Sequence, residues 1–231
     1  RVATGAATAI VELATAARAG TNGTVGVFVN TVATALEVAS KLGGEVEVVC
    51  GRMRPADLAK LRADHRGLLD ARGNDAVDFL VTTQSLEVGV DLDLPALVSE
   101  IAPASALAQR AGRLNRNGNH DGATLDIVAP RDLGEQSKLS ARDFAPYELE
   151  EIHAARDWIE RLAGDASPQR IAAEPPPIGE RPSLPPLSRV DLETLAMTSN
   201  ANSADPDVSL YIDEPRQHDE RLVSIGARRF L

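Results

Sequence analysis

Three arginines recur at every third position in the stretch QRAGRLNRNG, which covers residues 109–118. A guanidinium group is planar, always charged and able to bond two oxygen atoms of one anion. No Asp or Glu occurs between residues 101 and 120, so nothing within the stretch neutralises Arg110, Arg113 and Arg116. We therefore predict that an anion from elsewhere meets these side chains, with an arginine-rich surface exposed only to solvent as the alternative.

A helix is predicted over the surrounding segment SALAQRAGRLNR, residues 105–116. Such a helix would carry its apolar residues on one stripe and place Gln109, Arg113 and Arg116 within about 60° of each other on the other side. Like charges at this spacing destabilise a helix by about 0.2–0.5 kcal/mol per pair, which is a second reason to expect an anion there.

The elements that must position this helix are short apolar runs bounded by turn residues. We predict five strands, at residues 24–30, 45–50, 77–83, 96–102 and 123–129. Helical patterns alternate with these runs, which favours the α/β class, a doubly wound and mostly parallel sheet covered by helices on both faces. Ligands of such sheets bind at the carboxyl ends of the strands, so the polar residues that follow the runs are candidates for a site.

The composition and the hydrophobic pattern change along the chain, and we predict five segments. They are a leading Ala-rich helix at 1–19, the α/β domain at 20–130, a helical extension at 131–173, a Pro-rich linker or strap at 174–187 and an accessory tail at 188–231. One predicted helix of the α/β domain starts at Pro55 and continues to Gly73.

Composition excludes several classes of function. The net charge of -10 argues against a protein that holds nucleic acid by a broad basic surface. No apolar run approaches the roughly 18 residues of a membrane helix, and the single cysteine, Cys50, cannot form an internal disulfide, so we expect a cytoplasmic protein. The four histidines lack metal-ligand spacing, and no metal site is predicted.

The loops after the predicted strands resemble those of the second RecA-like lobe of superfamily 2 helicases. VFVNT resembles motif IV, FLVTTQSLEVGVDLD resembles motif V and QRAGRLNR resembles motif VI, in the order of that family. The resemblance implies a RecA-like sheet and an ATP molecule bound between two such lobes. It further implies that arginines of this lobe meet the γ-phosphate, where negative charge develops during hydrolysis.

By this resemblance, Arg113 and Arg116 are the arginine fingers, with Gln109 setting the geometry around the phosphates. The implied residues that contact ATP or couple its site to the strand are Gly89, Asp91 and Arg110. The implied nucleic-acid contacts are Asn30, Thr31, Gly51, Arg52, Thr82, Thr83 and Gln84. Their hydroxyl, amide and backbone groups would hold phosphates without reading bases.

Simpler roles stay open for several of these residues. Asn30 and Thr31 could cap the helix that follows them, and Gly89 could relieve a tight bend. Asp91 and Asp93 could be ordinary turn residues. On the later helix, Trp158 is interpreted as a packing anchor rather than a platform for stacked bases.

Two motifs of a complete motor do not occur. The sequence has neither a G-x-x-x-x-G-K-[ST] phosphate loop nor a D-E-x-[HD] stretch for Mg²⁺, and it begins with Arg1. We therefore expect the carboxyl-terminal part of a larger protein, whose first RecA-like lobe is the partner that mainly binds ATP and Mg²⁺. Alone, the chain is expected to hydrolyse essentially no ATP.

The wording of the motifs narrows the resemblance. TTQSLEVGVDLD, SALAQRAGRLNRNG and LETLAMTSNANSADPDVSLYID resemble the helicase of type I CRISPR systems, in the subtype G variety. This implies a helicase or translocase in CRISPR interference, with single-stranded DNA and the RNA-guided surveillance complex as partners. The His-Asp nuclease signature of those systems is not evident, since NHDG at 119–122 is an isolated pair. Two alternatives remain: another superfamily 2 DNA or RNA translocase, and a RecA-like binding module without motor function.

Overall fold

The computed structural model describes residues 4–51, 53–130, 133 and 144–177 of the chain. These residues all fall within one compact unit. The predicted nucleic-acid contact Arg52, most of the Pro-rich strap and the whole tail at 188–231 lie outside the described residues. No helix in the described part is both long and apolar enough to cross a membrane.

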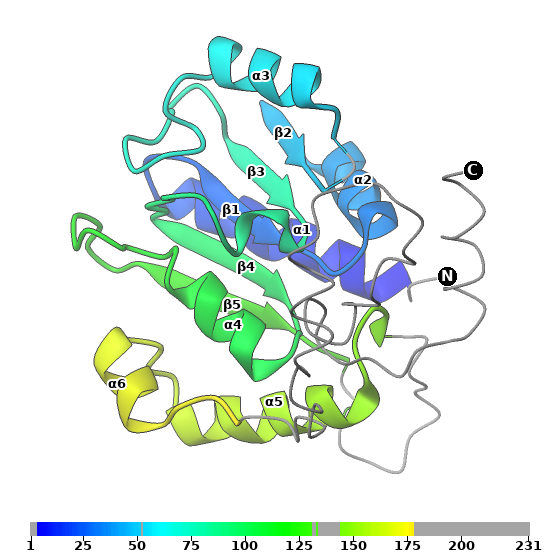
Figure 1. Ribbon diagram of the computed structural model, residues 1–231, viewed down its shortest axis with the longest axis vertical. Helices are drawn as coiled ribbons and strands as arrows, with labels where there is room; N and C mark the ends of the chain where they lie inside the picture. The colour runs from blue at the N-terminus through cyan, green and yellow to red at the C-terminus, as the bar shows by residue number, and fades with distance from the viewer. Residues whose placement is uncertain (1–3, 52, 131–132, 134–143, 178–231) are drawn as a thin grey trace, which may run out of the picture. The chain divides into compact units, whose positions relative to one another are not determined.

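A parallel sheet of five strands forms the centre of the fold (Figure 1). The strands are β1 (Val25–Phe28), β2 (Val46–Val49), β3 (Phe79–Thr82), β4 (Ala96–Glu100) and β5 (Thr124–Val128). Their order is β2-β3-β1-β4-β5, and every neighbouring pair is parallel. Both the five predicted strands and the predicted doubly wound α/β class are confirmed.

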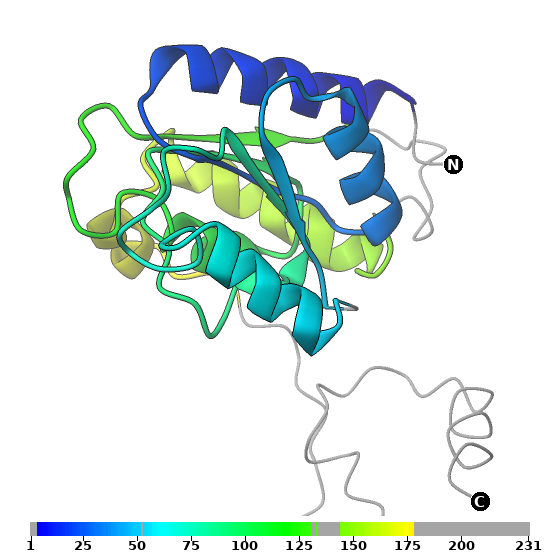
Figure 2. The ribbon, with the colours of Figure 1, turned by 90° about the horizontal axis from the view of Figure 1, so that it is seen from above.

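Helices cover both faces of this sheet (Figure 2). On one face, α1 (Thr4–Gly20) and α2 (Val32–Lys41) pack over side chains such as Val27 and Val98. On the other face lie α3 (Pro55–Asp64) and α4 (Ala104–Ala111), with α5 (Leu149–Leu162) and the short α6 (Pro168–Ala173) packed beside α4. Because β1 and β3 are buried on both faces, their sequences read as continuous apolar runs rather than as alternating ones.

The helix that starts at Pro55 is shorter than predicted. It ends at Asp64, and residues 65–73 form turns. Gly67 has a φ of +91°, and a Cβ atom there would lie 2.3 Å from the backbone oxygen of Gly73. The prediction of a helix to Gly73 was wrong because glycine here supports a left-handed turn, which a helix does not allow.

Gly67→Ala is therefore expected to destabilise the chain by about 1–3 kcal/mol, since the side chain would add both backbone strain and a collision. The free energy of unfolding in urea measures this effect. Gly43→Ala is the matched control, because a Cβ atom at Gly43 meets nothing within 4 Å. Equal stability of the two variants would contradict the expected strain.

Asp78 joins three elements just before β3. Its carboxylate accepts the backbone N–H of Glu45 at 2.9 Å and the Nε–H of Arg18, on α1, at 2.9 Å. The pKa of Asp78 lies below its ordinary value of 3.8. The hydrogen bond from the Glu45 N–H is the larger cause, and the bond from the Arg18 guanidinium is the next. A lowered pKa in the folded state means that this stabilisation is present above pH 3.8 and lost as the pH falls through the lowered pKa.

Asp78→Asn is expected to cost about 1 kcal/mol at neutral pH and progressively less below pH 4. Thermal unfolding of both proteins across this range is the measurement. A deficit that stays constant down to pH 2 would show that the charge of Asp78 contributes nothing.

Candidate functional site

The arginine-bearing stretch is not one helix. α4 ends at Ala111 with Gly112 as its C-cap, so Arg113 and Arg116 lie in the turns that follow. The backbone of Leu94 replaces the helical bonds: Leu94 N–H donates to Arg113 O, and Asn115 N–H donates to Leu94 O, both at 2.9 Å. The prediction of a helix up to Arg116 was wrong, because these hydrogen bonds with Leu94 replace those that would continue the helix. We call residues 112–118 the arginine turn.

Arg113 is only partly satisfied by the protein. Its Nη2 donates to the backbone oxygen of Glu87 at 2.6 Å. Its Nε is buried and has no hydrogen-bond partner within the described part of the chain. Burial lowers the pKa of the guanidinium, and the positive charge of Arg116 lowers it further. An anion beside Arg113 would relieve both effects.

Arg116 lies at the surface and faces Asp91. The Nε of Arg116 is 2.9 Å from Oδ1 of Asp91, and both side chains are exposed. Gly89, two residues earlier, has a φ of +83° and open space around it, so the bend there requires a residue that tolerates the left-handed region. The carboxylates absent from the arginine stretch thus come from the loop after β3.

Asp93 contacts the arginine turn and the residues that follow it. Its carboxylate is 4% exposed, accepts Nδ2–H of Asn117 at 2.9 Å and lies 3.7 Å from Nε2 of His120. Asn115, two residues before Asn117, has a φ of +43°, and its side chain accepts the backbone N–H of His120. Asp93 does more than a turn residue, because it holds in place the segment that carries Arg113 and Arg116.

Arg110 lies in the interior, at the other side of α4 from solvent. It is fully buried, and its Nε and Nη2 donate to Oε1 of Glu87 at 2.9 and 2.7 Å. A further bond goes to Oγ of Ser99 at 2.8 Å, and the guanidinium lies 5.7 Å from the centre of the Phe28 ring. Gln109, by contrast, is exposed. The structure therefore gives Arg110 an internal partner and leaves Gln109 free to face a ligand.

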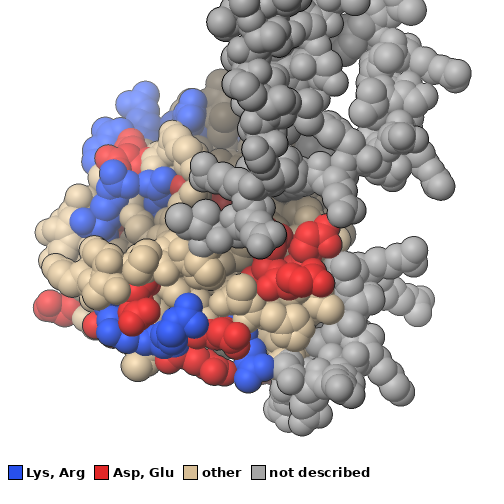
Figure 3. All heavy atoms as spheres, turned by 60° about the horizontal axis from the view of Figure 1, so that its bottom comes forward, with Lys and Arg blue, Asp and Glu red and all other residues tan. Residues whose placement is uncertain are grey.

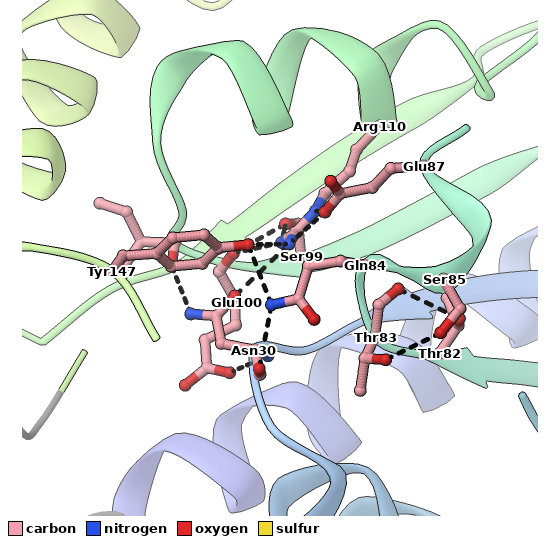
Figure 4. A network of polar contacts seen from close by, with 11 residues as sticks. Asn30, Thr82, Thr83, Gln84, Ser85, Glu87, Ser99, Glu100, Arg110 and Tyr147 are labelled. Carbon is pink, nitrogen blue, oxygen red and sulfur yellow. Dashed lines mark hydrogen bonds and ion pairs between the residues drawn. The ribbon is translucent and has the colours of Figure 1, made fainter. Parts of the chain in front are cut away.

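A buried polar network connects this arginine to the ends of β1 and β3 (Figure 4). Asn30 donates its backbone N–H to Glu100 at 2.8 Å and its side-chain N–H to Ile101 O at 2.7 Å. Gln84 donates from Nε2 to Asn30 O at 3.1 Å and to the hydroxyl of Tyr147 at 3.0 Å. Burial raises the pKa of Glu100 above its ordinary value.

The other predicted strand contacts surround this network. Thr31 caps α2, since its hydroxyl accepts the N–H of Thr34 at 3.1 Å. Thr82 and Thr83 are buried at the end of β3, and the Thr83 hydroxyl lies 3.1 Å from that of Ser85. Gly51, after β2, is exposed, and a Cβ there would lie 3.6 Å from the Ser85 hydroxyl. The fold thus gathers the strand-end candidates at the carboxyl edge of the sheet, whereas the arginine turn lies beside Leu94, just before β4 begins.

Five of the residues labelled in Figure 4 were not predicted, namely Ser85, Glu87, Ser99, Glu100 and Tyr147. Glu87 stood within the motif V resemblance and could have been chosen as the partner of a buried arginine. Tyr147 stood in no motif, and no spacing signal connected it to residues 63 positions earlier.

Acidic and basic side chains are mixed on the face seen in Figure 3, without one broad basic area. A separate cluster lies near β2, where ligand atoms of Glu45, Glu47 and His65 all fall within 4.8 Å of one another. Sequence spacing had indicated no metal site, because α3 separates His65 from the two carboxylates. Within the structure, His65 Nε2 lies 2.9 Å from Glu47 Oε1.

A parallel sheet in this strand order, with polar loops gathered at its carboxyl edge and an arginine turn after α4, defines a RecA-like lobe. Residues 21–119 match the family model described as CRISPR-associated nuclease/helicase Cas3, C-terminal. This part of the chain is thus similar to the C-terminal region of Cas3-like proteins, as the resemblance had implied.

Individual relatives agree with this family. The chain is 28% identical to a Cas3 nuclease/helicase of Myxococcus xanthus, over 83% of this chain and 24% of that protein. It is 34% identical to the CRISPR-associated helicase Cas3 of Thermoproteus tenax, over 61% and 23%. A crystal structure of T. fusca Cas3 with ATP matches with a TM-score of 0.58 and 20% identity, over 71% of this chain and 20% of that one. The chain thus spans about a quarter of the length of these two curated relatives.

Proposed function

We propose that this chain supplies the second RecA-like lobe of an ATP-dependent CRISPR-associated helicase, with Arg113 and Arg116 as its arginine fingers. The observation that carries the proposal is the incomplete pairing of Arg113. Its Nε is buried without an acceptor among the described residues, and a second guanidinium lies close enough to lower its pKa. Such a pair of charges suits a phosphate group better than it suits water.

ATP is the group that these residues would meet, and its hydrolysis would supply the free energy for movement along nucleic acid. Arg113 and Arg116 would hold the terminal phosphate, and Gln109 would line the same surface. Asp91 and Gly89 would lie toward the ribose. Mg²⁺ would be held by the first lobe, outside this chain.

Single-stranded DNA would bind along the carboxyl edge of the sheet. Gly51 is exposed there, and Thr31 and Gln84 are partly exposed, so all three can be reached by phosphates. The net charge of -10 favours binding through a few hydrogen bonds over binding through a broad basic surface. The first lobe and the RNA-guided surveillance complex are the proposed protein partners, and the subtype G assignment stays a prediction.

Comparison of the full-length protein with the isolated chain tests the proposal. The full-length protein is expected to hydrolyse ATP, faster with a single-stranded DNA oligonucleotide, and to displace an annealed strand. The isolated chain is expected to do neither, since ATP in such motors lies between two lobes. The proposal would be contradicted if single-stranded DNA did not change the rate of ATP hydrolysis, or if the isolated chain hydrolysed ATP.

A further inference from the structure

We propose that the hydroxyl of Tyr147 is an internal competitor for nucleic acid, because it occupies an amide hydrogen of Gln84 that a strand phosphate would need. Docking of the segment that carries Tyr147 and binding of the strand are then coupled in opposite directions. This inference rests on the proposed strand contact of Gln84.

The donors of Gln84 are fully used in the structure. A side-chain amide has two N–H groups, and Nε2 of Gln84 donates at 3.1 Å to the backbone oxygen of Asn30 and at 3.0 Å to the Tyr147 hydroxyl. A phosphate oxygen only accepts hydrogen bonds. Gln84 can therefore hold a phosphate only after it gives up one of these two partners.

Tyr147 is the partner that can leave. The Asn30 backbone is fixed between β1 and α2, and Glu100 also accepts its N–H. Tyr147 instead enters from the segment before α5, outside the residues 21–119 that the family model matches. Figure 4 shows its hydroxyl reaching the network from the side opposite Thr82 and Thr83.

The position of Tyr147 depends on how α5 packs. The Tyr147 ring packs against the cluster that contains Ile101 and Ile152, and Trp158 on α5 packs beside Leu107 on α4. The Tyr147 hydroxyl also lies 3.5 Å from Nη2 of Arg110. A partner that pulls α5 away from α4 would thus free an N–H of Gln84, and a bound strand would weaken the contact of Tyr147 by the same factor.

Binding of a labelled single-stranded DNA oligonucleotide by the full-length protein tests this coupling. Tyr147→Phe removes the hydroxyl and keeps the ring, and we expect about fivefold tighter binding, the equivalent of one hydrogen bond of about 1 kcal/mol. In a Gln84→Ala background the same substitution is expected to change nothing. Tyr211→Phe makes the same chemical change at the other tyrosine and is the control.

The outcomes separate this inference from the proposed function. Binding by Tyr147→Phe that equals or falls below the wild type overturns the inference alone, as does tightening that persists without Gln84. Absence of single-strand binding by the wild-type protein overturns the proposed function, and this inference with it. Equal melting temperatures of wild type and Tyr147→Phe would show that altered folding is not the cause.

Discussion

Arg113→Ala in the full-length protein is expected to lower single-strand-stimulated ATP turnover about 10³-fold while ATP still binds, the low end of the range for arginine fingers. The reason is positional. Glu87 O and the neighbouring turn hold the guanidinium in place before any ligand arrives, and its Nε lacks an acceptor within the described residues. An interaction made mainly as charge develops in the transition state affects turnover more than binding.

Steady-state turnover and ATP affinity, measured side by side, separate these two effects. Arg62→Ala is the matched control, because Arg62 is an exposed arginine of α3 and is not part of the arginine turn. Arg116→Ala is expected to act in the same direction as Arg113→Ala, although Asp91 would then lose its cation. Unchanged turnover in both variants would mean that the arginine turn is only a solvated surface.

Arg110→Ala is expected to destabilise the chain by about 3–5 kcal/mol, because it leaves the carboxylate of Glu87 uncompensated in the interior. Arg110 is fully buried, and the Glu87 side chain is 10% exposed. Replacing both at once, Arg110→Met with Glu87→Leu, is expected to recover most of the loss, since neither member of this ion pair is then left without its partner.

The free energy of unfolding in urea is measured for the wild type, Arg110→Ala and the double variant. The surface ion pair of Arg72 with Asp70 provides the comparison. The Arg72 side chain is 77% exposed, so Arg72→Ala is expected to leave the free energy of unfolding nearly unchanged. If Arg110→Ala cost as little as Arg72→Ala, the buried ion pair would have no role in holding the loops together.

The sheet could be predicted from sequence because its signals are local. Strands such as Val25–Phe28 and Phe79–Thr82 are short apolar runs between turn residues, and burial on both faces preserves that signal. The residues at which α3 and α4 end could not be predicted, because contacts with other segments determine them. The backbone oxygen of Gly73 leaves no room for a side chain at Gly67, and hydrogen bonds with Leu94 hold the arginine turn.

The site was predicted in part, for a related reason. The motifs identified Arg113, Arg116 and Asp91, and the fold brings them together. Burial is what sequence could not indicate: Arg110 and Asn30 carry ordinary polar side chains in the motifs, yet the fold uses both as interior groups. Tyr147 enters from beyond the motifs, and only the packing of α5 brings it there.

The pairing of Leu94 with the arginine turn has a mechanical consequence. One parallel bridge joins the turn to Leu94, just before β4, so the amide hydrogens of Leu94 and Asn115, which form its two bonds, should exchange slowly with solvent. A loop held in this way cannot swing on its own. The arginines would therefore be carried to their target by rotation of the entire lobe about a hinge outside it.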